Sequence, residues 1–393
     1  MKNKLYIFGP HDRFNYGDLL FPIMLEYGLK KLSNKSYDVV KASIVSADLC
    51  KLGGCKSINY KELTQKVKDG DVVIVAGGES LRATWKILYS YISPWYAKLI
   101  KRPRLFKIVR KIRFEKYWLG AKSEYPYCIN KSDFFKKIKV IYNSVGGGRS
   151  LEIQQIENLK QSDYMAVRDK KSFDILHSNR VENLFLVPDS AILLSDIFTV
   201  SKLLDAENKN TAKARSFLAK NEKYVFFQIS KARLLHNTVV VIEQLEKLSE
   251  AEQCTILLCP IGTALGHEDH IALKKIYGSL SCPKYLIHQP HIEDIMALIS
   301  QSSMYIGSSL HGAITSMSYG VPYITLDKRQ SKIKAYIETW GLQVFDEVQS
   351  LDNFYLKAMD IIEQSDYQAE ILQDAEIQKA KYYQSIERML QVI

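Results

Sequence analysis

The sequence predicts an α/β protein built from two doubly wound domains, and three observations point to this fold class. Short runs of Val, Ile, Leu and Phe recur along the chain, and the stretches between them have the spacing of amphipathic helices. Many of the apolar runs are continuous rather than alternating, which is typical of strands covered on both faces. A polar, lysine-rich interval near residues 196–222 divides the strands into two groups. Because strands that alternate with helices form parallel sheets, each group predicts one sheet with helices on both faces.

The predicted strands share a run of apolar residues and follow one another in chain order. In the first half of the chain they cover residues 5–9, 39–45, 71–77, 139–146, 164–168 and 183–188. In the second half they cover residues 224–230, 254–259, 285–289, 304–309 and 322–327. Helical spacing is clearest at residues 238–253, 291–301 and 331–341.

The two groups of strands define the expected domains. We expect an N-terminal Rossmann-like domain over residues 1–200, interrupted by a basic insertion at about 82–135. A linker region over 201–222 leads to a second Rossmann-like domain over 223–352, with a ligand-binding cleft between the two domains. Residues 353–393 are expected to form helices that pack back on the N-terminal domain.

Composition limits the class of protein and its partners. The 393 residues are 47% hydrophobic and 25% charged, a balance that excludes a disordered chain. The net charge of +11 favours anionic partners: nucleic acid, an acidic membrane, or small phosphorylated and carboxylated substrates. No apolar stretch approaches the roughly 20 residues of a membrane-spanning helix, and the N-terminus has the pattern of a strand rather than a signal peptide. The six cysteines lack metal-ligand spacing, so we expect reduced thiols in a cytoplasmic protein and no bound metal.

Residues 95–118 depart from the general pattern, because basic side chains interleave with aromatic and aliphatic ones and Glu115 is the only acid. This composition is typical of a surface segment that lies on anionic lipid or holds a lipid-linked substrate. A solvated basic helix with one buried stripe has the same composition, and nucleic-acid binding is the less favoured interpretation. We therefore expect a peripheral contact with anionic lipid at the inner face of the cell membrane, and no nucleic-acid partner.

Four glycine-rich or small polar turns follow predicted strands and precede predicted helices, at residues 8–18, 76–80, 143–150 and 307–312. In open α/β sheets, ligands bind outside the carboxyl ends of the strands. Glycine allows the backbone to approach a ligand, and the free N–H groups of the following helix attract an anion. A tight turn needs glycine for steric reasons alone, but four such turns in two domains favour a shared binding site. The substrate-binding residues predicted from these turns and from a further strand end are Asn15, Gly17, Gly77, Gly78, Glu79, Gly146, Gly147, Gly148, Arg149, Asp189, Ser308 and Ser309.

Three residues are the candidates for catalysis: His311, Arg168 and Asp18. His311 opens a predicted helix, whose dipole favours the neutral imidazole, a group that can accept a proton or hydrogen-bond an anion. Arg168 ends a predicted strand, where a guanidinium can bind a carboxylate or phosphate with two parallel hydrogen bonds. Each candidate has a structural alternative: a core histidine, an Arg168–Asp169 salt bridge, and a helix cap by Asp18 or Asn15.

Six motifs occur in the order NYGD, AGGESL, NSVGGG, AVRDKKSFDIL, VPDSAILL and YIGSSLHGAITSMSYGVPYITLD. In this order they resemble the polysaccharide pyruvyl transferase family over about residues 8–340. The resemblance implies a glycosyltransferase-B-like (GT-B-like) fold of two facing Rossmann-like domains. It matches His311 to the family's histidine near the donor substrate and Arg168 to the arginine of its VRD motif. The chain departs from many members at Ser309, where an arginine is common, so one anion contact must come from elsewhere. It also departs at Ser190, which follows Pro188-Asp189 where the family often has PDP.

Members of this family transfer a pyruvyl group from phosphoenolpyruvate to two hydroxyls of a sugar, forming a cyclic ketal on a cell-surface glycan or its lipid-linked precursor. The resemblance therefore implies phosphoenolpyruvate as the donor, a lipid-linked sugar acceptor and no cofactor. It also implies an acceptor on the N-terminal domain and a donor on the C-terminal one.

Two alternatives to this activity stay open. A nucleotide-sugar glycosyltransferase of the same fold would need a carboxylate near the donor ribose, for which Asp327 is the nearest candidate. A non-catalytic glycan- or membrane-binding protein would keep the fold without turnover.

Overall fold

The structure is a computed structural model, which describes residues 4–100, 102, 121, 123–148, 150–329, 331–364 and 367–393. The chain divides into two compact units. The first comprises Met1–Cys50, Gly54–Ser190 and Lys381–Ile393, and the second comprises Lys51–Gly53 and Ala191–Ala380.

The first unit is built on a sheet whose strands run in the order β3-β4-β2-β1-β5-β6-β7-β8, eight strands within the described residues. All neighbouring strands pair in parallel except β3 with β4. The central strand β5 is buried along its whole length, as expected for a parallel strand covered on both faces. The strands are β1 (Lys4–Phe8), β2 (Asp38–Ser43), β3 (Ala47–Asp48), β4 (Lys56–Asn59), β5 (Val72–Val75), β6 (Lys139–Val145), β7 (Tyr164–Val167) and β8 (Leu184–Leu186).

Helices connect these strands, and several begin at a side-chain cap. Asn59 accepts a hydrogen bond from the Glu62 N–H at the start of α2, and Asp169 accepts one from the Ser172 N–H at the start of α8. The helices of this unit are α1 (Tyr16–Leu32), α2 (Tyr60–Lys66), α3 (Trp85–Ser90), α4 (Pro94–Ile100), α7 (Ile153–Leu159) and α8 (Lys170–Ser178), with 3₁₀ turns at Cys50–Leu52 and Lys131–Asp133.

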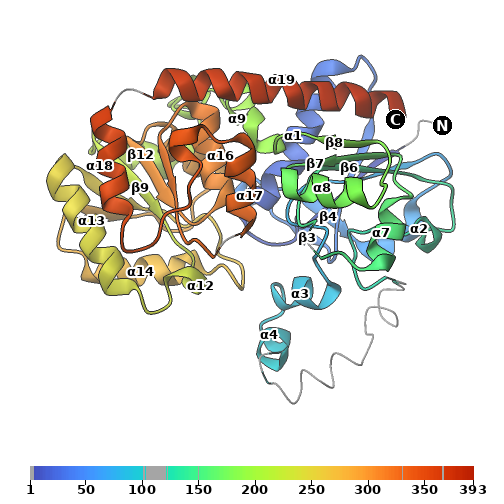
Figure 1. Ribbon diagram of the computed structural model, residues 1–393, viewed down its shortest axis with the longest axis horizontal. Helices are drawn as coiled ribbons and strands as arrows, with labels where there is room; N and C mark the ends of the chain where they lie inside the picture. Colours follow the sequence, from blue (N-terminus) through green and yellow to red (C-terminus); the bar gives the residue numbers. More distant parts are fainter. Residues whose placement is uncertain are drawn as a thin grey trace. The chain divides into compact units, whose positions relative to one another are not determined.

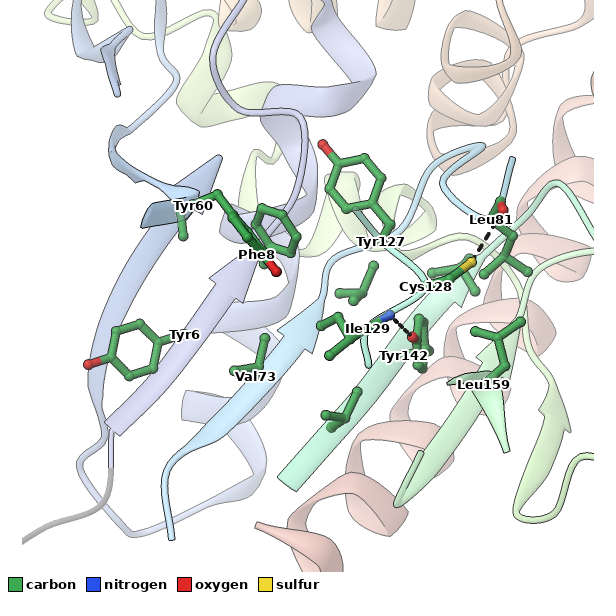
Figure 2. Close-up of a cluster of buried hydrophobic side chains, with 14 of the residues drawn as sticks. Tyr6, Phe8, Tyr60, Val73, Leu81, Tyr127, Cys128, Ile129, Tyr142 and Leu159 are labelled. Atoms are coloured by element: carbon green, nitrogen blue, oxygen red, sulfur yellow. Dashed lines mark hydrogen bonds between the residues drawn. The ribbon is translucent and has the colours of Figure 1, made fainter. Parts of the chain in front are cut away.

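The core of the first unit includes both described ends of the basic insertion. Trp85 before the basic segment and Tyr127 and Cys128 after it are each at most 1% exposed. Figure 2 shows Cys128 donating to the Leu81 carbonyl at 3.3 Å, and the Ile129 N–H donating to the Tyr142 hydroxyl at 2.9 Å. The two ends of the insertion therefore help to cover the sheet.

The second unit is built on a sheet in the order β11-β10-β9-β12-β13, five parallel strands within the described residues. Its central strand β9 is fully buried, so helices cover both faces of the sheet. The strands are β9 (Tyr224–Gln228), β10 (Thr255–Leu258), β11 (Lys284–Leu286), β12 (Met304–Gly307) and β13 (Tyr323–Thr325).

The helices of the second unit surround this sheet and are coloured from green to red in Figure 1. They are α9 (Leu194–Ile197), α10 (Val200–Leu203), α11 (Ala212–Leu218), α12 (Lys231–Leu234), α13 (Thr238–Glu252), α14 (Asp269–Ser279), α15 (Ile292–Ser300), α16 (Leu310–Tyr319), α17 (Ser331–Trp340), α18 (Phe354–Gln364) and α19 (Gln368–Val392), with 3₁₀ turns at Ser190–Leu193, Lys209–Thr211 and Gln343–Phe345. No helix in the described residues is both long enough and apolar enough to span a bilayer.

The C-terminal helix α19 contributes to both units. Its last residues, from Lys381 onward, belong to the first unit, where Tyr382 is fully buried and donates to the Asn143 side chain at 3.0 Å. The Tyr164 and Ser385 hydroxyls lie 2.8 Å apart. The end of the chain therefore completes the core beside β6 and β7.

The division between the units falls after Ser190, whereas the sequence suggested a junction at residues 201–222. Those residues contain α10 and α11, helices of the second unit, because apolar side chains such as Leu203 and Phe217 are buried there. Most of the basic segment 95–118 lies outside the described residues, and so does Arg149.

Candidate functional site

The loop between β1 and α1 brings a buried histidine to the carboxyl end of β1. The His11 Nδ1 lies 3.0 Å from the Asp18 carbonyl oxygen, and the side chain is fully buried. Its Nε2 has no hydrogen-bond partner among the described residues. Burial lowers the pKa of His11 to about 4, so the imidazole is neutral at physiological pH. A Cβ at Gly9 would lie 2.7 Å from the His11 ring, which explains the glycine there.

Arg13 joins two aspartates in the same loop. Its guanidinium donates to Asp12 at 2.8 Å and lies 3.8 Å from the Asp18 carboxylate. The guanidinium also lies over the Tyr91 ring, 5.4 Å from its centre. Asn15 occupies the N-cap of α1, but its amide donates to the Asp18 carboxylate at 2.9 Å instead of capping the helix. The Asp18 carboxylate is therefore held by Arg13 and Asn15.

The glycine turns after β5 and β6 lie side by side. Gly78 forms a parallel bridge with Val145, and the Gly146 N–H donates to the Gly78 carbonyl at 2.7 Å. A Cβ at Gly146 would lie 2.9 Å from Arg168 Nε, so the turn passes directly over that side chain. Positive φ angles, which favour glycine, occur at Gly77 (103°), Gly78 (79°) and Gly147 (94°).

Arg168 follows β7 and forms a buried ion pair across the strand ends. Its Nη1 donates to Asp189 at 2.8 Å, and its Nη2 lies 3.6 Å from Glu79. Burial alone would lower the pKa of Arg168, but the two carboxylates outweigh it and raise the pKa. The Asp189 side chain is fully buried, whereas 34% of the Glu79 side chain is exposed. Of these three side chains, Glu79 is therefore the one that solvent reaches.

The loop between β12 and α16 carries the candidate histidine of the second unit. The buried Ser308 hydroxyl accepts a hydrogen bond from the Ser230 N–H at 3.3 Å. Ser309 occupies the N-cap of α16 but makes no side-chain capping bond. His311 lies in the first turn of α16 and is half-buried. The histidine and the Ser309 hydroxyl therefore lie at the carboxyl end of the strand, where α/β proteins bind ligands.

Two arginines share one aspartate beside this loop. Asp327 follows β13 with a φ of 77° and is 4% exposed. Arg329, from the loop after β13, donates to it at 2.6 Å, and Arg233, from the short helix α12 that follows β9, at 3.2 Å. Arg329 also donates to the Arg233 carbonyl at 3.3 Å, so α12 and the loop after β13 are in contact. Because β12 lies between β9 and β13, the two arginines flank the strand that leads to His311.

The structure groups the sequence-predicted residues into two sets. Asn15, Asp18, the glycines of the turns, Glu79, Arg168 and Asp189 lie at the carboxyl ends of strands of the first unit, whereas Ser308, Ser309 and His311 lie at the end of β12 in the second. Gly17 lies inside the first turn of α1. That the two sets share one ligand stays a prediction.

Sequence reasoning missed five residues of these clusters: His11, Asp12, Arg13, Arg233 and Arg329. The first three lie in a turn that the sequence did single out, so their place in it was the available signal. Arg233 and Arg329 follow predicted strands, but nothing in the sequence shows that they converge on Asp327. Among the described residues, no three His, Cys, Asp or Glu side chains gather as metal ligands do.

Comparison with known proteins identifies the family of the chain. A sequence model described as polysaccharide pyruvyl transferase matches residues 15–327, which covers most of the chain. No curated protein sequence matches the chain significantly.

Solved structures match the whole chain at low sequence identity. A UDP-GlcNAc 2-epimerase from Neisseria meningitidis, solved with UDP-GlcNAc, has a TM-score of 0.54 at 14% identity over 100% of both chains. A putative UDP-N-acetylglucosamine 2-epimerase from Listeria monocytogenes has a TM-score of 0.57 at 11% identity, covering 95% of this chain and 91% of that one. The epimerase from Methanocaldococcus jannaschii has a TM-score of 0.55 at 14% identity, covering 98% of this chain and 100% of that one.

These likenesses show the fold alone, because the identities are low. The fold is the GT-B-like α/β class, as the sequence predicted. The extent of the family match goes further, and the chain belongs to the polysaccharide pyruvyl transferase family.

Proposed function

We propose that this protein transfers a pyruvyl group from phosphoenolpyruvate to two hydroxyls of a sugar, forming a cyclic ketal. In this reaction the vinyl CH₂ takes up a proton and becomes a methyl group. The two sugar oxygens bond to the neighbouring carbon, and its bond to the phosphate oxygen breaks. The two sugar hydroxyls release two protons. One of them accounts for the proton that the new methyl group takes up, and the other leaves with inorganic phosphate. The reaction needs no cofactor beyond the donor itself.

The observation that carries the proposal is the pair of arginines that follow β9 and β13, the two strands on either side of the strand that leads to His311. Phosphoenolpyruvate has a phosphate and a carboxylate within three carbons, so its site needs more than one cation. Arg233 and Arg329 share Asp327, which leaves one positive charge in excess. Their side chains are 35% and 52% exposed, so each keeps N–H donors for a ligand. In this proposal the two arginines make the anion contact for which many family members use an arginine at the position of Ser309.

His311 follows β12, which lies between β9 and β13, the strands that precede the two arginines. From the first turn of α16 its imidazole can assist proton transfer or hydrogen-bond the departing phosphate. Both roles assist the step in which the carbon–oxygen bonds form and phosphate leaves. Removing the imidazole ring should therefore slow turnover. The neutral, buried His11 lies in the first unit and is not part of this step.

Asp327 gives a reason to prefer phosphoenolpyruvate over a nucleotide sugar. A glycosyltransferase needs a free carboxylate for the hydroxyls of the donor ribose. Both oxygens of Asp327 already accept from arginine: Oδ1 from Arg329 Nε at 2.6 Å, and Oδ2 from Arg233 Nη1 at 3.2 Å. The carboxylate is also 4% exposed. In this proposal Asp327 therefore orients Arg233 and Arg329 toward an anionic donor and does not bind the ribose of a nucleotide sugar.

The acceptor in this proposal is the sugar of a lipid-linked glycan, bound by the first unit. Carboxylates such as Asp18 and Glu79 can accept hydrogen bonds from sugar hydroxyls, and in this proposal Asp18 accepts a hydroxyl proton. Contact with anionic lipid through residues 95–118 would bring such an acceptor to the protein. Neutralising Lys98 and Arg102 should then weaken sedimentation with phosphatidylglycerol vesicles, and unchanged sedimentation would contradict the lipid contact.

The test is incubation with phosphoenolpyruvate and a panel of lipid-linked galactosyl and mannosyl acceptors. Mass spectrometry should find a pyruvyl adduct, and a phosphate assay should find one phosphate released per adduct. UDP-sugars in place of phosphoenolpyruvate should give no product. Hexose transfer from a UDP-sugar would overturn the proposal in favour of a glycosyltransferase, and binding without turnover of any donor would favour a non-catalytic protein.

Variants connect the activity to the residues. His311→Ala should lower turnover by about 100-fold or more, since general acid–base groups typically contribute that much. Arg329→Gln should raise the KM for phosphoenolpyruvate by roughly tenfold, because it removes a charge-assisted contact. Lys328→Gln is the matched control, because the Lys328 ammonium pairs with Glu347 at 3.1 Å and is 58% exposed. An equal effect of Lys328→Gln would show that only general surface charge matters.

A further inference from the structure

The loop that carries His311 is tied to the neighbouring strand by a side-chain amide. Gln228 is the last residue of β9 and is 2% exposed. The Ser308 N–H donates to the main-chain carbonyl of Gln228 and to its side-chain Oε1, both at 3.1 Å. The Tyr305 hydroxyl donates to the same Oε1 at 3.4 Å and to the Ser309 carbonyl at 3.3 Å. One amide oxygen therefore holds the strand and the loop that leads to the helix.

A buried carboxylate decides which end of that amide faces the loop. The Gln228 Nε2 donates to Asp269 Oδ2 at 2.8 Å. The same oxygen accepts from the N–H groups of Ile261 and Gly262 at 3.1 and 2.9 Å, so the carboxylate cannot turn away without losing both. Because Oδ2 already accepts from two main-chain N–H groups, it is an acceptor in either protonation state of Asp269, and only the amide nitrogen of Gln228 can donate to it. The Gln228 oxygen must then face Ser308.

Tyr305 is packed closely against two glycines of the loop and helix. A Cβ at Gly307 or at Gly312 would overlap the end of the Tyr305 ring, so both glycines make room for it. Gly312 directly follows His311, and the tyrosine therefore packs against the first turn of α16. A shift of the Gln228 amide would move Tyr305 and Ser308, and with them the turn that carries the imidazole.

We propose that Gln228 and Asp269 are positioning residues, which fix the loop of Ser308 and Ser309 and thereby the place of His311 in the reaction. The proposal rests on the proposed function for the role of His311. Neither residue touches substrate in it. Their effect is on the alignment of the imidazole, and misalignment by about 1 Å can cost roughly 100-fold in rate. Donor affinity comes from Arg233 and Arg329 and should be largely independent of them.

The test compares two buried glutamines of the same unit. Gln228→Met keeps the size of the side chain and removes the amide. Gln244→Met is the matched control, because Gln244 is 8% exposed and its Oε1 also accepts a single main-chain N–H, that of Tyr355 at 3.1 Å. Gln228→Met should lower kcat by about tenfold or more with the KM for phosphoenolpyruvate within about threefold. Gln244→Met should leave both within about twofold. Equal losses of kcat in the two variants, or no loss in Gln228→Met, would overturn the proposal.

A second measurement does not depend on activity. Amide hydrogen exchange of residues 304–312 should be faster in Gln228→Met than in the wild type, and unchanged in Gln244→Met. Asp269→Asn is the conservative variant, since its side-chain oxygen can still accept from Gln228, and it should retain most of the protection and of kcat. Unchanged exchange in Gln228→Met would overturn the proposal that Gln228 fixes the loop of Ser308 and Ser309. If exchange is faster in Gln228→Met but the wild type does not use phosphoenolpyruvate, Gln228 still fixes the loop and the proposed function is rejected.

Discussion

Replacing Asp269 with asparagine removes an ionisable group from the interior of the second unit, and the effect on stability should depend on pH. Asp269 is fully buried, and burial raises its pKa from 3.8 to about 7 despite hydrogen bonds from Gln228, Ile261 and Gly262. The folded protein then binds a proton at this site more tightly than the unfolded chain does. The contribution of Asp269 to the free energy of unfolding therefore falls as pH rises from about 4 to 7, and it is constant above the pKa of the folded state.

The magnitude comes from the difference between the two pKa values. Three pKa units correspond to about 4 kcal/mol, of which roughly 2–3 kcal/mol falls between pH 5 and pH 8. The amide of the Asp269→Asn variant would not titrate. Its nitrogen would take the place of Oδ1, which has no partner among the described residues, at a pH-independent loss of about 1–3 kcal/mol. Asp269→Asn should therefore be less stable than the wild type at pH 5 and about as stable or more stable at pH 8.

Urea unfolding at pH 5, 6, 7 and 8, followed by tryptophan fluorescence, measures this difference. All other groups titrate in both proteins, so the difference between the two stability curves isolates Asp269. The stability of the variant relative to the wild type should rise by roughly 2–3 kcal/mol across this range. A flat difference would show that Asp269 ionises as it does in the unfolded chain and would refute the reasoning from burial.

Three further perturbations test other parts of the structure. Asp189→Asn should destabilise the protein by about 3–5 kcal/mol in urea unfolding, because it breaks a buried ion pair with Arg168, whereas Asp174→Asn at an exposed pair should cost under about 0.5 kcal/mol. Gly312→Ala should cost about 1–3 kcal/mol by overlap with Tyr305 and reduce turnover, and a fully active, stable variant would contradict the packing. Raising the salt concentration from about 0.05 to 0.5 M should raise the KM for phosphoenolpyruvate several-fold and leave the acceptor KM nearly unchanged, and equal effects would contradict an arginine-based donor site.

The sheets were the predictable part of the fold, since buried parallel strands leave a continuous apolar run in the sequence. The runs at 71–77, 224–230 and 304–309 became β5, β9 and β12. The short strands β3 and β4 were not predicted, because Ala47–Asp48 and Lys56–Asn59 are half-exposed and mostly polar. Their place at the edge of the sheet is fixed by pairing rather than by composition.

Side-chain partners were the unpredictable part of the site. The glycine turns and His311 could be found from the sequence, because strand ends and helix starts have local signals. The partners of Arg168 could not, since Asp189 and Glu79 lie on other strand ends and meet it only through the order of the sheet. Gln228 had no signal at all: it ends an apolar strand, and its role depends on Asp269, 41 positions away.

The charged groups at the strand ends of the two units differ in the sign of their net charge. This difference bears on which unit binds which proposed substrate. In the first unit Arg13 and Arg168 are outnumbered by the carboxylates that contact them, which are Asp12, Asp18, Glu79 and Asp189. An excess of carboxylates would disfavour a phosphate and favour hydroxyls, which donate to carboxylates. In the second unit two arginines share one aspartate, and the excess positive charge attracts an anion. The opposite balances therefore support a donor on the second unit and a sugar on the first, an assignment that the sequence took only from the family resemblance.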